Sequence, residues 1–255
     1  MSDRSLAALP FIATTLWTAI VNCAGIIPPE ISSLPKPSNS GPTVLIHGAG
    51  GPLGSLAVRL FSLWGWKIIA TIKSEQSKEF LLKQKNVQII ETDDKKQENN
   101  NNNNINNNIK VGRELPEWSS LIERSSLTLF IDCVGGISSE SAGFALLKNG
   151  GSFVTLRGSI VSLTDKYGLI SGSLKSANSL MKSKARFASI GVSYHWVINQ
   201  PQPEALKYLS QLIDSGHNLN IPINNQKFKN IDGIKDAMKY SLKNSSQSKI
   251  IVELN

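Results

Sequence analysis

The hydrophobic residues of this 255-residue chain form short β-branched runs that alternate with amphipathic stretches. The clearest run is Val44-Leu45-Ile46, and the apolar residues after it, from Leu56 to Trp64, recur at helical spacing. Alternation of strand and helix patterns at this spacing is typical of a parallel, doubly wound α/β sheet. The chain is therefore predicted to have a Rossmann-type fold.

Further runs extend this pattern along the chain. The predicted strands after the first are 67–72, 87–90, 127–132, 152–156 and 186–192. The predicted helices between and after them are 75–85, 116–123, 139–147 and 203–215. A short strand near 221–223, a helix over 231–242 and a last strand over 250–254 complete the prediction.

Two segments interrupt the alternation. Residues 6–29 carry no charge, but Pro10, several threonines and the Pro28-Pro29 pair favour a buried helix over a signal sequence or an integral membrane span. The residues before that segment include both Asp3 and Arg4, so they lack the positive bias of a secretory leader. Residues 97–108 contain nine asparagines and are expected to form a disordered surface loop.

A glycine-dense turn joins the first predicted strand to its helix. The spacing is Ala49-x-Gly51-x-x-Gly54, with Gly50 between the first two positions. Gly50 and Gly51 allow a pyrophosphate to approach the backbone, where the helix offers N–H groups and the positive end of its dipole. Gly54 allows the helix to pack closely on the strand. The turn predicts a dinucleotide site, the alternative being a tight βα turn that binds nothing.

The residues that follow the second strand bear on the choice of cofactor. An acidic residue at this point favours NAD, whereas a basic or small polar residue accommodates the 2′-phosphate of NADP. Lys73 and Ser74 occupy the position here, and Glu75 is the one residue that argues the other way. We therefore expect NADPH as the cofactor.

Composition narrows the possible partners. The chain is 40% hydrophobic and 18% charged, and its net charge of +8 is spread along the sequence. The nearest approach to a basic cluster is Lys175, Lys182, Lys184 and Arg186, without a nucleic-acid-binding motif, so we expect no nucleic-acid partner. Two cysteines cannot build a disulfide framework, and three scattered histidines provide no metal-ligand spacing, so no metal is expected.

Several segments resemble the quinone oxidoreductase branch of the medium-chain dehydrogenases/reductases. Residues Ala8–Ala19 are similar to the linker helix of that family, and Asp132–Gly136 and Lys148–Leu156 to its fourth and fifth strands. The ending, with Gly191–Trp196 and Lys249-Ile-Ile-Val, is similar to that of one mitochondrial member. The resemblance implies an NADPH-dependent oxidoreductase that acts on a quinone or enone and supports mitochondrial ubiquinone metabolism.

The resemblance also implies particular cofactor contacts. Together with Gly54 and Lys73 from the turn and strand arguments, the expected cofactor-binding residues are Gly50, Gly51, Pro52, Leu53, Gly54, Lys73, Ser74, Cys133, Leu156 and Tyr194. Three positions depart from the family pattern: Pro52 replaces a glycine, Thr92 replaces a common tyrosine, and residues 245–248 replace a His/Arg/Gly-containing stretch. No residue is named catalytic, because in this branch the cofactor supplies the chemistry and the protein orients it.

The resemblance sets the expected domain organisation. The linker helix and loop span 1–41, the nucleotide-binding domain 42–217, and a C-terminal return segment 218–255 forms a partial remnant of a GroES-like domain that is otherwise missing. With that domain absent, we expect nucleotide binding but poor quinone reduction.

Two other function classes compare with this one as follows from the residues. A short-chain dehydrogenase is excluded because no tyrosine is followed four residues later by lysine. A non-catalytic NADP(H)-binding interaction or regulatory protein is the alternative that stays open.

The resemblance implies a mitochondrial location, although no transit peptide is visible and a cytoplasmic location is the alternative. A homodimer is the candidate assembly.

Overall fold

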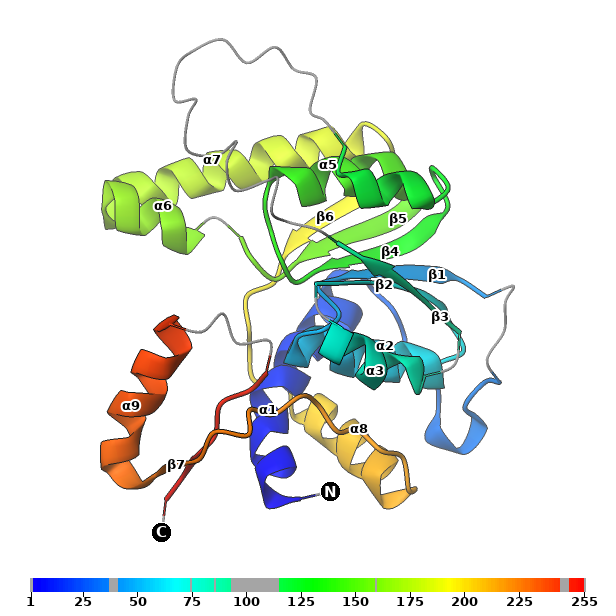
Figure 1. Ribbon diagram of the computed structural model, residues 1–255. Helices are drawn as coiled ribbons and strands as arrows, with labels where there is room; N and C mark the ends of the chain where they lie inside the picture. The colour runs from blue at the N-terminus through cyan, green and yellow to red at the C-terminus, as the bar shows by residue number, and fades with distance from the viewer. Residues whose placement is uncertain are drawn as a thin grey trace.

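A six-stranded parallel sheet organises the chain. The computed structural model describes residues 2–36, 41–73, 75–84, 86–92, 115–158, 160–243 and 248–254. The strand order is β3-β2-β1-β4-β5-β6, and every neighbouring pair is parallel (Figure 1). The order reverses direction between β1 and β4, which confirms the predicted doubly wound fold. The strands are β1 (Thr43–His47), β2 (Lys67–Ile72), β3 (Val87–Glu91), β4 (Leu127–Asp132), β5 (Leu147–Thr155) and β6 (Ser193–Trp196).

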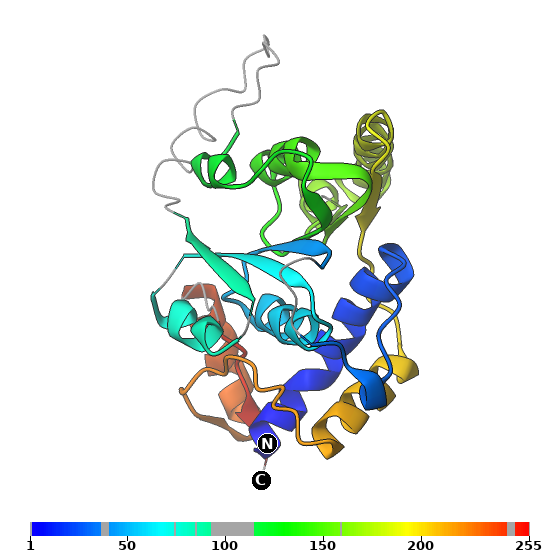
Figure 2. The same cartoon turned by 90° about the vertical axis from the view of Figure 1, so that its right-hand side faces the viewer.

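Helices cover both faces of this sheet (Figures 1 and 2). Side chains of β1 alternate between two cores: Val44 and Ile46 belong to one apolar cluster and Leu45 to the other. This alternation follows from the two-residue period of a strand. On one side lie α1 (Asp3–Trp17), α2 (Pro52–Leu63), α3 (Glu75–Leu82) and α8 (Pro203–Asp214); on the other lie α5 (Ile137–Leu146), α6 (Ile160–Tyr167) and α7 (Leu169–Ala188).

The apolar N-terminal segment is helical, as predicted. Helix α1 continues into the π-helical turn η1 (Thr18–Cys23), and Ile12, Leu16 and Ile20 are at most 2% exposed within the first core. Asp3–Cys23 is long and apolar enough to cross a membrane by length and composition alone. Its packing against α2 and α8 gives the segment the burial of a core helix.

The prediction of a sixth strand over 186–192 is wrong. Arg186–Ala188 is the last turn of α7, and the strand β6 begins at Ser193. The helix ends because Gly191 adopts a φ of +68°, and the amide of Val192 donates to the carbonyl of Phe187 at 3.1 Å. This is a glycine-dependent helix stop. The buried Phe187 therefore packs from a helix rather than from a strand.

Other elements differ in extent from their predictions. The helix expected over 116–123 is the short 3₁₀ turn η4 (Glu117–Leu121). Strand β5 begins five residues earlier than expected, at Leu147, so the preceding helix stops at Leu146. The helical pair α6–α7 was not predicted at all. The asparagine-rich tract 97–108 lies outside the described residues.

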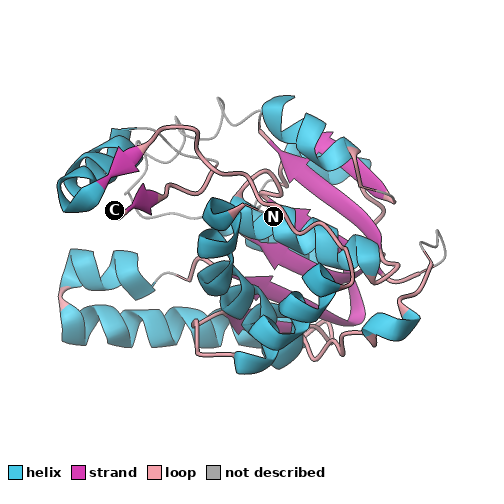
Figure 3. Ribbon diagram, turned by 90° about the horizontal axis from the view of Figure 1, so that it is seen from below, coloured by secondary structure: helices cyan, strands magenta, loops and turns pink. Residues whose placement is uncertain are grey.

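The C-terminal segment forms a small unit of its own (Figure 3). Strands β7 (Phe228–Lys229) and β8 (Val252–Glu253) pair in parallel, and α9 (Asn230–Lys243) lies between them in the sequence. The strand expected near 221–223 is reduced to a single bridge between Ile223 and Lys249. The helix expected over 231–242 is confirmed, and the last strand is shorter than predicted.

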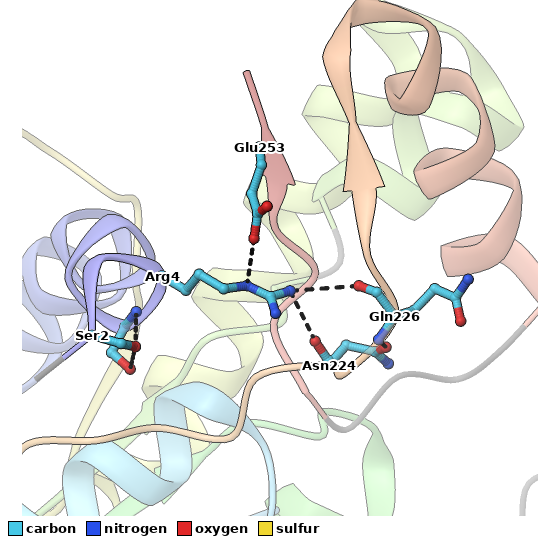
Figure 4. Close-up of polar contacts among 6 residues, drawn as sticks. Ser2, Arg4, Asn224, Gln226 and Glu253 are labelled. Atoms are coloured by element: carbon cyan, nitrogen blue, oxygen red, sulfur yellow. Dashed lines mark hydrogen bonds and ion pairs between the residues drawn. The ribbon is translucent and has the colours of Figure 1, made fainter. Parts of the chain in front are cut away.

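Arg4 ties this C-terminal unit to the N-terminal helix (Figure 4). Its Nε lies 3.3 Å from Oε1 of Glu253, and its Nη2 donates to the carbonyls of Asn224 (3.3 Å) and Gln226 (3.5 Å). One guanidinium thus joins α1 to β8 and to the segment that precedes β7. The ion pair is partly exposed, so its contribution is on the order of 1 kcal/mol.

We expect Arg4→Gln to loosen the C-terminal unit selectively. Amide hydrogen exchange at residues 248–254 should accelerate about fivefold, the equivalent of roughly 1 kcal/mol, while exchange in β1 and β4 stays unchanged. The exposed Lys207→Gln on α8 is the matched control. Unaltered exchange at 248–254 in the Arg4 variant would show that apolar packing alone holds the unit.

Candidate functional site

The turn after β1 is held from both neighbouring strands. The Gly48 amide donates to Oγ1 of Thr71 on β2 at 3.1 Å, and the Ala49 amide donates to the Thr71 carbonyl at 2.9 Å. On the other side, the Cys133 amide donates to the His47 carbonyl at 3.0 Å. Gly48 has a φ of +83°, a conformation that favours glycine. The turn is therefore fixed at the carboxyl edge of the sheet, where open α/β sheets bind ligands.

Gly54 and Gly51 play different parts in this turn. A Cβ on Gly54 would lie 2.5 Å from the Gly48 carbonyl oxygen and 2.6 Å from Cα of Ala49, both of them backbone atoms. A Cβ on Gly51 would meet only the Gly48 oxygen, at 3.7 Å. Gly54 is thus required for the close packing of α2 on the turn. Gly51 has an extended backbone, with φ −79° and ψ 169°, and borders open space.

That open space is a cavity of about 350 Å³ above the turn. Its described lining contains three cations, Lys73, Arg157 and Lys249, and no carboxylate. The N-terminus of α2 adds the positive end of a helix dipole. A polyanion is the ligand that this charge favours. The other lining residues are Phe11, Ile12, Gly48, Gly50, Gly51, Pro52, Leu53, Gly54, Ile72, Cys133 and Val134.

Most of the predicted cofactor residues meet at this cavity. Gly50, Gly51, Pro52, Leu53, Gly54, Lys73 and Cys133 all line it. Leu156 does not line it but packs against the adjacent core, and its amide donates to the Asp132 carbonyl at 2.9 Å. Ser74 lies outside the described residues.

Tyr194 is placed on the opposite face of the sheet. Its ring stacks on Phe153 with centroids 5.3 Å apart, inside the second core. Its hydroxyl donates to Oε1 of Glu140 at 2.6 Å and accepts a hydrogen bond from Nε1 of Trp196 at 2.8 Å. The structure therefore does not bring Tyr194 to the cavity.

Three lining residues of chemical interest were missed from the sequence. Arg157 lies two residues beyond the end of β5, and directly after the predicted strand 152–156, so the strand-end rule that singled out Lys73 could have found it. Lys249 and Phe11 come from opposite ends of the chain, and Nζ of Lys249 lies 5.1 Å above the Phe11 ring. Neither carries a local sequence signal, because their approach depends on tertiary packing.

Burial suppresses ionisation of the thiol beside the turn. Desolvation raises the pKa of Cys133, and the neighbouring Asp132 raises it further. Asp132 itself is 1% exposed and accepts hydrogen bonds from the Val134 and Gly135 amides at 3.1 and 2.8 Å. Cys133 therefore remains a neutral thiol near pH 7 and acts as an apolar wall of the cavity rather than as a nucleophile.

A larger cavity of about 660 Å³ lies elsewhere, between Trp17 at the end of α1, the segment 28–32 and α8. Its described lining includes Trp17, Tyr208, Glu30 and Asp214 and contains no lysine or arginine. Two carboxylates without a cation disfavour a phosphate-bearing ligand. Among the described residues, no group of three or more His, Cys, Asp or Glu side chains is placed to hold a metal ion.

Comparison with known proteins agrees with this geometry. The chain is 28% identical over 212 residues to a protein of Danio rerio named NAD(P)H oxidoreductase RTN4IP1, mitochondrial, covering 82% of this chain and 47% of that one. It is 24% identical to the protein of the same name from Dictyostelium discoideum, covering 99% of this chain and 65% of the relative. The chain is similar to NAD(P)H oxidoreductases. The predicted resemblance to a mitochondrial oxidoreductase of this kind is confirmed.

Solved structures confirm the fold at lower identity. The CurK enoyl reductase superimposes with a TM-score of 0.63 at 21% identity, covering all of this chain and 64% of the other. The quinone oxidoreductase from Coxiella burnetii superimposes with a TM-score of 0.63 at 18% identity, covering all of this chain and 62% of the other. No family model matches the chain. The chain spans about half to two thirds of the length of these proteins.

We expect Gly54→Ala and Gly51→Ala to have opposite outcomes. The first places a methyl group against backbone atoms of the turn and should cost about 2–3 kcal/mol of unfolding free energy. The second meets no close atom and should change it by less than about 1 kcal/mol. Urea unfolding followed by circular dichroism measures both. Equal effects would contradict the close approach of α2.

His47 generates a pH dependence of stability. Burial, together with nearby Lys73, lowers its pKa from 6.5 to about 4, and Nδ1 lies 2.6 Å from Oγ1 of Thr71. Because the unfolded chain binds a proton that the folded chain does not, stability is retained above pH 6.5 and falls towards pH 4. The loss attributable to His47 is up to about 3 kcal/mol. Urea unfolding between pH 7 and pH 4.5 should therefore show that the free energy of unfolding falls less steeply with decreasing pH in His47→Gln than in the unchanged chain. An equal dependence on pH in both proteins would exclude His47 as the source.

Proposed function

We propose that the cavity above the glycine turn binds NADPH and that this chain carries the cofactor-binding half of an oxidoreductase. The observation that carries the proposal is the combination of a glycine turn, a helix N-terminus and three cations around one cavity. The cavity can hold only part of a dinucleotide, which leaves the remainder along the sheet edge. The substrate class is a small quinone or enone.

The proposed contacts follow from the position of each group. The pyrophosphate would lie over Gly50–Gly54, since a side chain on Gly51 would project into open space. Lys73, just beyond β2, would meet the 2′-phosphate, and Ser74 is proposed beside it on the sequence alone. Arg157 would add charge from the segment after β5, and Lys249 would add charge from the C-terminal unit. Cys133 would form an apolar wall, and Leu156 would support that wall from the adjacent core. Tyr194 is left out because its hydroxyl donates to Glu140.

The relatives support the same reading of the chain. Their names include NAD(P)H and mitochondrial, and we propose a nicotinamide cofactor and a mitochondrial location on that basis. Support of ubiquinone metabolism and a homodimeric assembly stay proposals. So does the division into a nucleotide-binding domain over 42–217 and a return segment after it.

A bound nicotinamide cofactor supplies hydride, and the chain contributes its position and surroundings. Phe11 and Ile12 of α1 give the cavity an apolar wall, which limits access of water. Lys249 contacts the Phe11 ring and so brings a cation from the C-terminal unit to the same wall.

The test is a fluorescence titration of the purified chain with NADPH and with NADH. NADPH should bind more tightly, and Lys73→Glu should narrow the difference by about 1–3 kcal/mol, the value of one charge-assisted bond. Gly51→Val should abolish binding of both nucleotides. The variant should remain folded, because the extended backbone at Gly51 accommodates a side chain. Lys207→Gln is the matched control. Tighter binding of NADH, or full affinity in a folded Gly51 variant, would refute the assignment.

Turnover separates an enzyme from a binding protein. NADPH oxidation with a short-chain quinone at a rate on the order of 1–10³ s⁻¹ would establish the oxidoreductase. Nucleotide binding with no turnover for quinones or enones would favour the non-catalytic alternative.

A further inference from the structure

The helical hairpin α6–α7 projects from the sheet. Gly168, with a φ of +78°, makes the turn between the two helices. A Cβ on Gly172 would lie 2.4 Å from Cα of Thr164 and 2.5 Å from the Leu163 carbonyl oxygen, so the two helix backbones are in direct contact. The hairpin extends well beyond the strands in two perpendicular views (Figures 1 and 3).

The outer face of α7 carries an exposed apolar stripe. Ile170, Leu174 and Met181 are 86%, 73% and 71% exposed. Their spacing of four and seven residues places them on one side of the helix, opposite the buried Gly172 and Ser176. Large apolar side chains that are exposed on one side of a helix are candidates for an interaction site.

The apolar surface continues around the tip of the hairpin. Leu169 is 78% exposed and Tyr167 is 42% exposed. Nζ of Lys175 lies 3.2 Å above the Tyr167 ring, which combines an amphipathic aromatic ring with a cation at the same tip. Aromatic rings and lysines of this kind are enriched where proteins meet the headgroup region of a bilayer.

The charge beside this stripe has one sign. Residues 160–188 contain five lysine or arginine residues and a single acid, Asp165. At 100° per residue, Lys184 falls on one side of the stripe and Lys175 and Lys182 fall on the other. The stripe is therefore flanked by cations on both sides.

Helix α9 is the internal comparison. It also exposes apolar side chains, with Ile231 at 77% and Met238 at 64%. Its charges alternate in sign, however, because Asp232 and Asp236 lie between or beside lysines. Of these two exposed helices, only α7 combines an apolar stripe with unmixed positive charge.

We propose that the α6–α7 hairpin docks on an anionic lipid surface. The stripe and the tip enter the boundary between headgroups and acyl chains, and the flanking lysines pair with lipid phosphates and carboxylates. A second copy of this chain is disfavoured as the partner, because the lysines of its α7 would face the lysines of the first copy. One acidic helix from a partner would cover the narrow stripe but would leave the tip at Leu169 and Tyr167 uncovered. The inference rests on the hairpin alone and does not depend on NADPH binding.

The experiment is co-sedimentation of the full chain with large unilamellar vesicles in 0.1 M salt, near the physiological ionic strength. Vesicles of phosphatidylcholine with about 30 mol% phosphatidylserine should bind the protein, and pure phosphatidylcholine should bind it at least about tenfold more weakly. Raising the salt to about 0.5 M should release it. The double variant Lys175→Gln/Lys182→Gln should weaken binding about thirtyfold. The triple variant Ile170→Ser/Leu174→Ser/Met181→Ser should abolish it.

Matched changes elsewhere provide the controls. Lys207→Gln/Lys235→Gln removes two exposed lysines from α8 and α9, and Ile231→Ser/Met238→Ser removes exposed apolar side chains from α9. Both should bind vesicles as the unchanged chain does, and circular dichroism verifies that every variant is folded.

Four outcomes would overturn the proposal. The unchanged chain fails to sediment with anionic vesicles, or the hairpin variants sediment as well as it does. Binding survives high salt and is indifferent to the hairpin, which would implicate insertion of α1 instead. Sedimentation equilibrium without lipid shows a dimer that the triple variant dissociates, which would identify the stripe as a contact between copies.

Discussion

A single approach of backbone to backbone sets the geometry on which the rest depends. The first turn of α2 lies directly over Gly48 and Ala49, at a distance that leaves no space for a Cβ at position 54. Only this closeness brings the positive end of α2 to the carboxyl edge of β1 rather than to the side of the sheet. Thr71 and Cys133 then fix the turn from both sides.

The same constraint explains how much the sequence could predict. A strand, a glycine turn and a helix are local patterns, and parallel pairing sends every strand end to one edge. The turn and Lys73, which the sequence singles out by their spacing, therefore line one cavity. The strand-end rule applied to β5 would also have found Arg157.

What the sequence left unpredicted depends on longer-range packing. Strand β6 was misplaced because the apolar residues Phe187 and Ile190 fit the pattern of a helix as well as that of a strand. The helix stop at Gly191 decides between the two. The hairpin α6–α7 was missed because half of the residues of α7 are polar and because α7 packs on α6, a contact that no local pattern signals. Tyr194 was assigned to the cofactor by resemblance, and the alternation along β6 sends its side chain to the opposite face.

The wall of the cavity joins segments that are far apart in the sequence. Phe11 and Lys249 meet across it, and Arg4 on the same helix holds the strand that follows Lys249. The N-terminal helix thus orders the C-terminal unit and lines the cavity at once. A ligand that contacts Lys249 stabilises the ordered C-terminal unit. By linkage, any change that loosens this unit lowers the affinity for that ligand.

The positively charged side chains discussed above lie in two different environments. Lys73, Arg157 and Lys249 surround a cavity, where low-dielectric walls reduce screening by salt. The lysines of α7 lie on an exposed helix. The Debye length of about 8 Å at physiological salt limits their attraction to a charged surface that is almost in contact with the helix. Salt therefore acts differently on the two sites: it weakens attachment of the hairpin steeply, whereas a ligand enclosed by the cavity retains more of its electrostatic energy. Because apolar burial does not share this salt dependence, the stripe of Ile170, Leu174 and Met181 is what allows the hairpin to stay bound once charge has brought it to the surface.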